Sequence, residues 1–109
     1  MLFDTRQTVA FTGTPAELEA QLVPLMDALL ALADADLGLT DPDLAATITS
    51  RQVDVTMTVD AHDTATAVGR AASALRAAIS TSGGTGWQAA TAVVHAELAE
   101  DPDRGAIGP

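Results

Sequence analysis

The sequence predicts a two-layer α+β domain in which a four-stranded antiparallel sheet carries two helices on one face. Three observations indicate this class. Apolar and polar residues alternate in four short segments, which is typical of half-buried strands. Apolar residues recur every three or four positions in two longer segments, which is typical of amphipathic helices. Along the chain the segments follow the order β-α-β-β-α-β.

The first strand is expected over residues 5–12, where apolar residues and threonines alternate. A helix is expected directly afterwards, because Thr14 is a suitable N-cap, Pro15 fits the first helical position and Glu17 completes a capping box. Pro24 lies inside this helix and predicts a kink or a restart, since proline lacks an N–H donor. The apolar stripe of the helix consists of Leu18, Leu22, Leu25, Leu29 and Leu32.

Two strands are expected in the middle of the chain, over residues 44–50 and 53–60, after a connection at 34–43. The apolar positions are even in the first strand and odd in the second. Directly opposed residues must therefore have numbers that sum to an odd value, and the hairpin loop must hold an even number of residues. Because no Asn-Gly or Asp-Gly pair favours a two-residue turn, we expect a four-residue loop at 50–53.

The second helix is expected over residues 64–80, with Asp63 as its N-cap and Gly83 at its end. The last strand is expected over residues 87–98. No linker divides the chain, so we expect one domain over residues 1–100 and a loose tail over 101–109, where two prolines and two glycines occur.

This element order is the split β-α-β arrangement called ferredoxin-like. Its strands lie in the spatial order 4-1-3-2, and both helices cover the same face of the sheet. The apolar parity of all four strands is explained if it faces the helices. This agreement between independent segments supports the predicted fold.

Composition excludes several classes of function. The chain has 109 residues and no cysteine, which excludes disulfides and thiolate ligands. Five arginines, no lysine and fifteen acidic residues give a net charge of −10, and only three residues are aromatic, so we expect no nucleic-acid partner. No signal peptide or membrane-spanning run is recognised, and we expect a cytoplasmic protein without a membrane partner.

Motifs for catalysis or metal binding are weak. His62 and His95 are the only side chains that ordinarily titrate near neutral pH, and both are interpreted as surface residues without a special role. The acidic segment 34–43 lacks the spacing of a calcium loop, and the glycine-rich segment 83–86 lacks that of a phosphate loop. We therefore expect no catalytic residue, cofactor or metal ligand, and no enzymatic activity.

Charge is distributed unevenly along the chain. Residues 14–43 carry seven acidic side chains and no arginine. This segment is interpreted either as a solvated face or as a docking surface for a basic protein. The single tryptophan is interpreted either as packing over the end of the sheet or as an exposed anchor for a partner or a dimer. The predicted partner-binding residues are Glu17, Glu19, Asp27, Asp34, Asp36 and Trp87.

The outer face of the predicted sheet is rich in threonine. It lacks the stacking aromatic residues with which related RNA-binding domains hold their ligand. Small, nearly neutral side chains suit either water or a second sheet, so a homodimer through this face or through a strand edge is a further hypothesis. The predicted dimer face consists of Thr47, Thr49, Thr56, Thr58, Thr91 and Val93.

The leading functional hypothesis is a small, acidic, non-enzymatic protein-interaction or regulatory module that forms a homodimer. One alternative is a ferredoxin-like domain that senses a small molecule, as ACT-like domains do. Another is an acidic inhibitor that imitates the charge of a nucleic acid. An enzyme of the dimeric α/β-barrel kind would need a polar pocket between sheet and helices, where the sequence predicts inward Val, Ala, Leu and Met.

Overall fold

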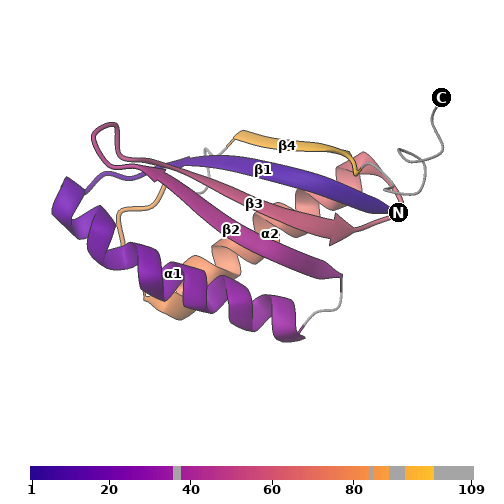
Figure 1. Ribbon diagram of the computed structural model, residues 1–109, viewed down its shortest axis with the longest axis horizontal. Helices are drawn as coiled ribbons and strands as arrows, with labels where there is room; N and C mark the ends of the chain where they lie inside the picture. Colours follow the sequence, from indigo (N-terminus) through magenta and orange to yellow (C-terminus); the bar gives the residue numbers. More distant parts are fainter. Residues whose placement is uncertain (36–37, 84, 89–92, 100–109) are drawn as a thin grey trace, which may run out of the picture.

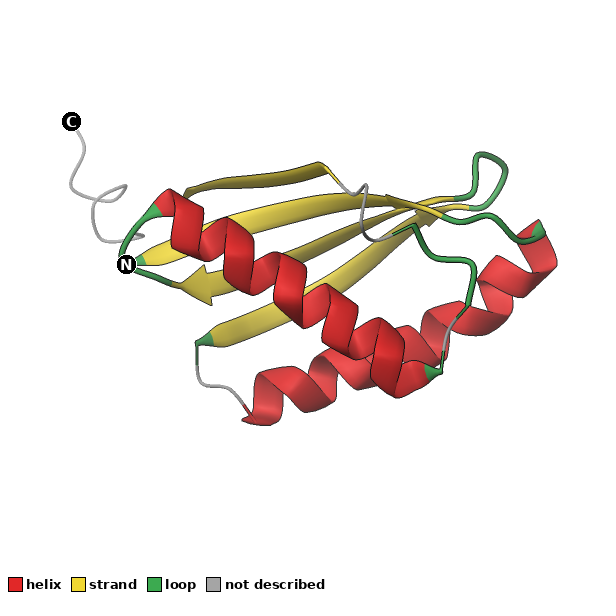
Figure 2. Ribbon diagram, turned by 180° about the vertical axis from the view of Figure 1, so that it is seen from behind, coloured by secondary structure: helices red, strands yellow, loops and turns green. Residues whose placement is uncertain are grey.

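The computed structural model describes residues 1–35, 38–83, 85–88 and 93–99, and it confirms the predicted order of elements. The strands lie in the order β2-β3-β1-β4, and each adjacent pair is antiparallel. Both helices pack on one face of the sheet and leave the other bare (Figures 1 and 2). The fold is therefore ferredoxin-like, as predicted. The elements are β1 (Leu2–Ala10), α1 (Pro15–Ala35), β2 (Leu39–Thr47), β3 (Gln52–Asp60), α2 (Thr64–Ser82) and β4 (Val93–Leu98).

The core lies between the sheet and the two helices. Odd-numbered residues of β1 and β3 point inward and are fully or almost fully buried, while their even-numbered neighbours are more exposed. α1 packs beside β2, and α2 packs over β1, β3 and β4. The residues of β1 and β3 that the sequence predicts to face the helices are therefore the residues that the helices cover.

Local signals define both helices. In α1, the Glu17 N–H donates to Thr14 Oγ1 over 3.2 Å, and the Thr14 N–H donates to Glu17 Oε1 over 3.3 Å, which is the predicted capping box. The helix continues through Pro24 without a restart. In α2, the Thr66 N–H donates to Asp63 Oδ1 over 2.7 Å, and this hydrogen bonding lowers the pKa of Asp63. Gly83 ends α2 at φ 70°.

β2 begins five residues earlier than predicted, at Leu39, and ends at Thr47. The 34–43 segment is therefore partly strand. An irregularity between Thr40 and Asp43 accommodates Pro42, which a strand at the sheet edge tolerates because its outer side needs no hydrogen-bond donor. The hairpin loop holds four residues as predicted, but it spans 48–51 because Thr47 pairs with Gln52.

β1 and β4 also differ from their predicted bounds. β1 begins at Leu2 rather than at residue 5. In β4, the described strand starts at Val93, and Trp87 forms only an isolated bridge with Phe11. Residues 89–92 of the predicted strand and the predicted tail, residues 101–109, lie outside the described residues.

Two polar side chains interrupt the apolar inner face, contrary to the expectation of inward Val, Ala, Leu and Met alone. Gln7 is 1% exposed and donates from Nε2 to the carbonyl oxygen of Ala71 in α2 over 2.8 Å. Thr5 is 3% exposed and donates to the carbonyl oxygen of Met57 over 2.8 Å. Both polar groups are tolerated because the protein supplies their hydrogen-bond partners.

No helix in the described part of the chain is both long enough and apolar enough to cross a bilayer.

Candidate functional site

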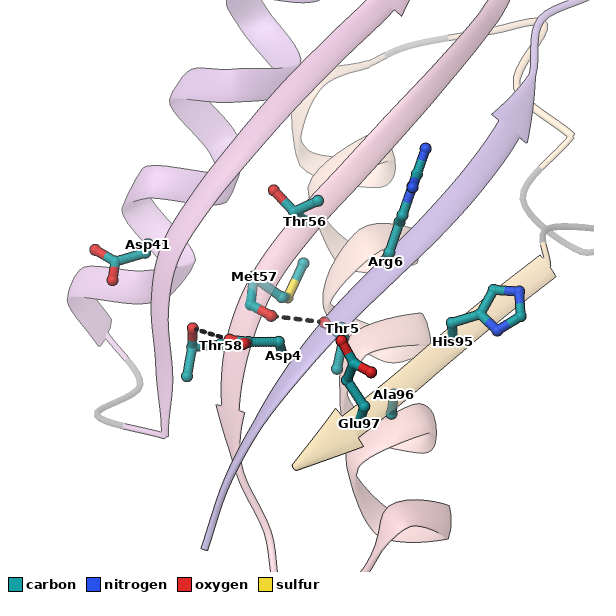
Figure 3. Close-up of a pocket in the computed structure, with 10 residues that line it drawn as sticks. All are labelled: Asp4, Thr5, Arg6, Asp41, Thr56, Met57, Thr58, His95, Ala96 and Glu97. Carbon is teal, nitrogen blue, oxygen red and sulfur yellow. Dashed lines mark hydrogen bonds between the residues drawn. The ribbon is translucent and has the colours of Figure 1, made fainter. Parts of the chain in front are cut away.

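A pocket of about 560 Å³ lies on the outer face of the sheet, which the helices do not cover (Figure 3). All four strands contribute to it. Three of its lining residues, Thr5, Met57 and Ala96, have the parity of the inner face, and the others contribute charged side chains, hydroxyls and one imidazole. The lining residues are Asp4, Thr5, Arg6, Asp41, Thr56, Met57, Thr58, His95, Ala96 and Glu97.

Strand register arranges the polar lining residues in two rows across the sheet. In the first row, Arg6 of β1 lies between Thr56 of β3 and His95 of β4. We call these three residues the basic row. In the second row, Asp4 lies between Thr58 and Glu97 in the same way. We call Thr58, Asp4 and Glu97 the acidic row. Alternate residues of a strand share a face, so two neighbouring rows of one face differ by two residues along each strand.

Asp54 positions Arg6. Arg6 Nη2 donates to Asp54 Oδ2 over 2.7 Å, and Thr8 Oγ1 donates to Asp54 Oδ1 over 2.8 Å. The hydrogen bond from Arg6, followed by the one from Thr8, lowers the pKa of Asp54. The carboxylate therefore remains charged and holds one edge of the guanidinium.

The acidic row is ordered on one side by a hydrogen bond. Thr58 Oγ1 donates to Asp4 Oδ1 over 3.1 Å. Asp41 belongs to β2, which pairs with β3 on the side of Thr58. It lies at the strand irregularity, and its φ of 52° is unusual for a residue with a side chain. The irregularity therefore adds a third carboxylate to this end of the pocket.

The two histidines are in different surroundings. His95 is exposed on β4 and lines the pocket (Figure 3), and no hydrogen bond joins its imidazole to another described residue. His62 follows β3 outside the pocket, and its Nε2 lies 3.2 Å from Asp63 Oδ2. Within the described ranges, no group of three or more His, Asp and Glu side chains is placed to hold a metal ion.

The predicted partner-binding residues do not form one surface. Glu19, Asp27 and Asp34 are exposed on α1; helical periodicity places Asp27 and Asp34 opposite the leucine stripe and Glu19 beside it. Glu17 caps the helix start. Asp36 lies outside the described residues, and the other acidic residues of the 14–43 segment, at 41 and 43, belong to β2.

Trp87 packs at the end of the sheet. Its ring meets Phe11 edge to face with centroids 5.0 Å apart, and its Nε1 donates to Gln21 Oε1 over 2.8 Å. It is partly buried, so much of the area that an anchor for a partner would present is already in contact with the protein itself.

The predicted dimer-face residues are only partly on the sheet. Thr56 and Thr58 lie on the outer face of β3 and line the pocket, and Thr47 is exposed at the end of β2. Thr49 is not on a strand: it lies in the 48–51 loop, because β2 ends two residues before it. Val93 belongs to β4 and pairs with Thr8, whereas Thr91 lies outside the described residues.

Two further grooves differ in character from the outer pocket. One of about 580 Å³ runs between α1 and α2, and one of about 260 Å³ lies between α1 and β2. Each is lined mainly by Leu, Ala, Val or Met, with few polar groups to orient a ligand. Their charged residues are Arg70, which donates to the carbonyl oxygen of Asp60 over 2.7 Å, and Asp43, which accepts the Leu44 N–H over 2.9 Å.

Sequence reasoning missed most of the pocket. Asp4 was not placed on the sheet because the first strand was expected to begin at residue 5. Arg6 has the same parity as Thr8 and could have been placed on the outer face. His95 was interpreted as a surface residue without a special role. The position of Asp41 depends on the strand irregularity, for which the sequence offers only Pro42 as a signal.

No known family model matches the chain, and no curated protein is significantly similar to it in sequence. Among solved structures, the chain is similar to a "putative antibiotic biosynthesis monooxygenase" from Caulobacter crescentus CB15. The two share 17% identity with a TM-score of 0.57, over 92% of this chain and 91% of the other. At this identity the likeness shows the fold alone.

This comparison corrects the functional hypothesis. The leading interpretation, a non-enzymatic protein-interaction module, is wrong: the similar structure is named for antibiotic biosynthesis, which agrees better with the alternative of a domain that senses a small molecule. The charge pattern led to the error because the 14–43 segment was treated as one acidic surface, whereas the fold divides it between a helix and an edge strand.

Proposed function

We propose that this protein is a small-molecule-binding ferredoxin-like domain and that the outer-face pocket is its binding site. The observation that carries the proposal is the pocket itself: about 560 Å³ of concave space, in which polar side chains from β1, β3 and β4 converge. Small-molecule sites typically have volumes of about 300–1,000 Å³ and a few oriented polar groups. The similarity to a protein named for antibiotic biosynthesis supports the same class of ligand.

The proposal is limited to binding. Among the described residues, no pocket hydroxyl is hydrogen-bonded to His95, so the pocket shows no paired nucleophile and base. Thr58 instead donates to a carboxylate, and Thr5 to a backbone carbonyl oxygen. Monooxygenase activity belongs to the name of the similar protein, and we do not transfer it to this chain.

A thermal-shift screen of metabolites, followed by calorimetry, tests the proposal. A ligand present at about ten times its Kd stabilises the folded state by about 1.4 kcal/mol. For a domain of this size, that raises Tm by about 6–11 °C. We expect at least one metabolite to produce such a shift.

A pair of matched variants locates the site. Thr56→Trp fills the pocket from an exposed outer-face position, and Thr47→Trp adds the same side chain to the outer face outside the pocket. We expect Thr56→Trp to abolish the shift and Thr47→Trp to preserve it, with both variants folded by circular dichroism. Equal binding by both variants would place the site elsewhere and overturn the proposal.

A further inference from the structure

The two rows of the pocket bear opposite charge. Arg6 is the cation of the basic row, and His95 beside it adds an imidazole. The acidic row holds the carboxylates of Asp4 and Glu97, with Asp41 near its β2 end. In Figure 3 the Arg6 and His95 side chains extend away from Asp4 and Glu97. The pocket is therefore dipolar along the strand direction.

We infer that the ligand is a small zwitterion, with an anionic group bound at the basic row and an ammonium group bound at the acidic row. This inference rests on the proposed function, because it names the class of ligand for the same pocket. The rows are two residues apart, which is roughly 6.6–6.8 Å along a strand. An ammonium and a carboxylate separated by several bonds span this distance, as they do in an ω-amino acid.

Arg6 remains able to bind an anion although Asp54 contacts it. A guanidinium has five N–H donors, and the Asp54 contact joins one nitrogen, Nη2, to one oxygen. The side chain of Arg6 is 63% exposed, so its other donors are accessible from the pocket. Asp54 thus acts as a positioning residue that fixes the guanidinium while the rest of the group stays open.

The same charges disfavour simpler ligands. An anion without a positive charge, bound at Arg6, would lie near the carboxylates of Asp4, Asp41 and Glu97, none of which forms an ion pair with another described residue. A plain cation at the acidic row would gain nothing from Arg6. A ligand that bears both charges interacts favourably with both rows at once. The charge pattern therefore favours a zwitterion over a ligand that carries only the anionic group or only the cationic group.

The direct test is titration calorimetry with γ-aminobutyrate and two derivatives of the same chain length. Pentanoate has a methyl group in place of the ammonium group and keeps only the carboxylate, and γ-aminobutyramide keeps only the ammonium group. We expect each derivative to bind at least about tenfold more weakly than γ-aminobutyrate, because a hydrogen-bonded charge is lost at one row. Equal affinity of either derivative and the zwitterion would overturn the inference.

Charge-matched variants connect this preference to the rows. Arg6→Gln and Asp4→Asn each remove one pocket charge, and each should weaken γ-aminobutyrate binding about tenfold. Their controls, Arg76→Gln on α2 and Asp27→Asn on α1, remove the same charges from exposed helix positions and should leave affinity unchanged. Melting curves verify that all four variants fold. If pocket variants and controls lose affinity equally, only the net charge matters and the inference fails.

The screen of the proposed function separates failure of the inference from failure of the proposal. If Thr56→Trp abolishes binding of a neutral or singly charged metabolite while γ-aminobutyrate does not bind, the pocket is a ligand site and the zwitterion class is wrong. If Thr56→Trp changes the binding of no metabolite, the pocket is not the binding site, and both the proposed function and the zwitterion inference are wrong.

Discussion

The two faces of this sheet contain polar residues for different physical reasons. On the inner face, Gln7 and Thr5 are almost fully buried, and each has a hydrogen-bond partner in the protein. On the outer face, Arg6 and Asp4 alternate with them along the same strand, remain exposed and contact other polar side chains. Polar groups on the inner face must be satisfied by the protein, whereas those on the outer face remain available to water or a ligand.

The largest expected difference between the faces concerns apolar packing. Met57→Ala removes a buried side chain, 4% exposed, from the inner face of β3 and should lower the free energy of unfolding by about 2–5 kcal/mol. Thr56→Ala, one residue earlier and exposed on the outer face, should cost less than about 1 kcal/mol. Urea denaturation measures both variants. Similar losses would show that the outer face is also a packed surface in solution.

A smaller difference is expected for the polar pair on β1. Gln7→Ala removes the buried amide that donates to Ala71 and should cost about 1–3 kcal/mol. Arg6→Ala removes an exposed ion pair with Asp54 and should cost at most about 1 kcal/mol. Chemical denaturation at neutral pH compares them. If Arg6→Ala lowered the free energy of unfolding more than Gln7→Ala does, the exposed ion pair would stabilise the fold more than the buried amide, which would contradict this prediction.

A still smaller change in the free energy of unfolding, and one that depends on pH, is expected at the Arg6–Asp54 pair. Hydrogen bonding to Arg6 and Thr8 lowers the pKa of Asp54 in the folded state. Its stabilisation is therefore present above the unfolded-state pKa of about 3.9 and is lost as pH falls through the lower folded-state pKa. Asp54→Asn should cost about 0.5–1 kcal/mol at pH 7, and this cost should fall progressively as the pH is lowered below the unfolded-state pKa. A cost that does not fall with pH would indicate lost packing instead of lost charge.

The smallest change in the free energy of unfolding is expected for a substitution in the predicted dimer face. The homodimer stays a prediction, and Thr56 and Thr58 are the outer-face residues that would meet a second sheet. Thr58→Arg should shift the protein toward monomer in sedimentation equilibrium and leave unfolding of the monomer almost unchanged. A wild-type protein that is monomeric at all concentrations tested would remove the dimer hypothesis and leave the pocket open.

Local sequence signals predicted the elements well, because each signal acts within a few residues. The capping box at Thr14 and Glu17, the N-cap Asp63 and the end at Gly83 satisfy nearby backbone groups, and all are present in the structure. The start of β2 was wrong by five residues because Gly38 and Pro42 resemble a loop. Pairing with β3 from Leu39 onward overrode that local preference.

By itself, the sequence determined the fold class, the order of the elements and the face of each strand that the helices cover, because periodicity and capping are local properties of a chain. Tertiary structure alone decided which side chains share the outer pocket. Asp4, Arg6 and His95 come together through the register of β1 with β4, and Asp41 joins them through an irregularity at the sheet edge. Register and irregularity depend on strands far apart in sequence, so no local pattern reveals them.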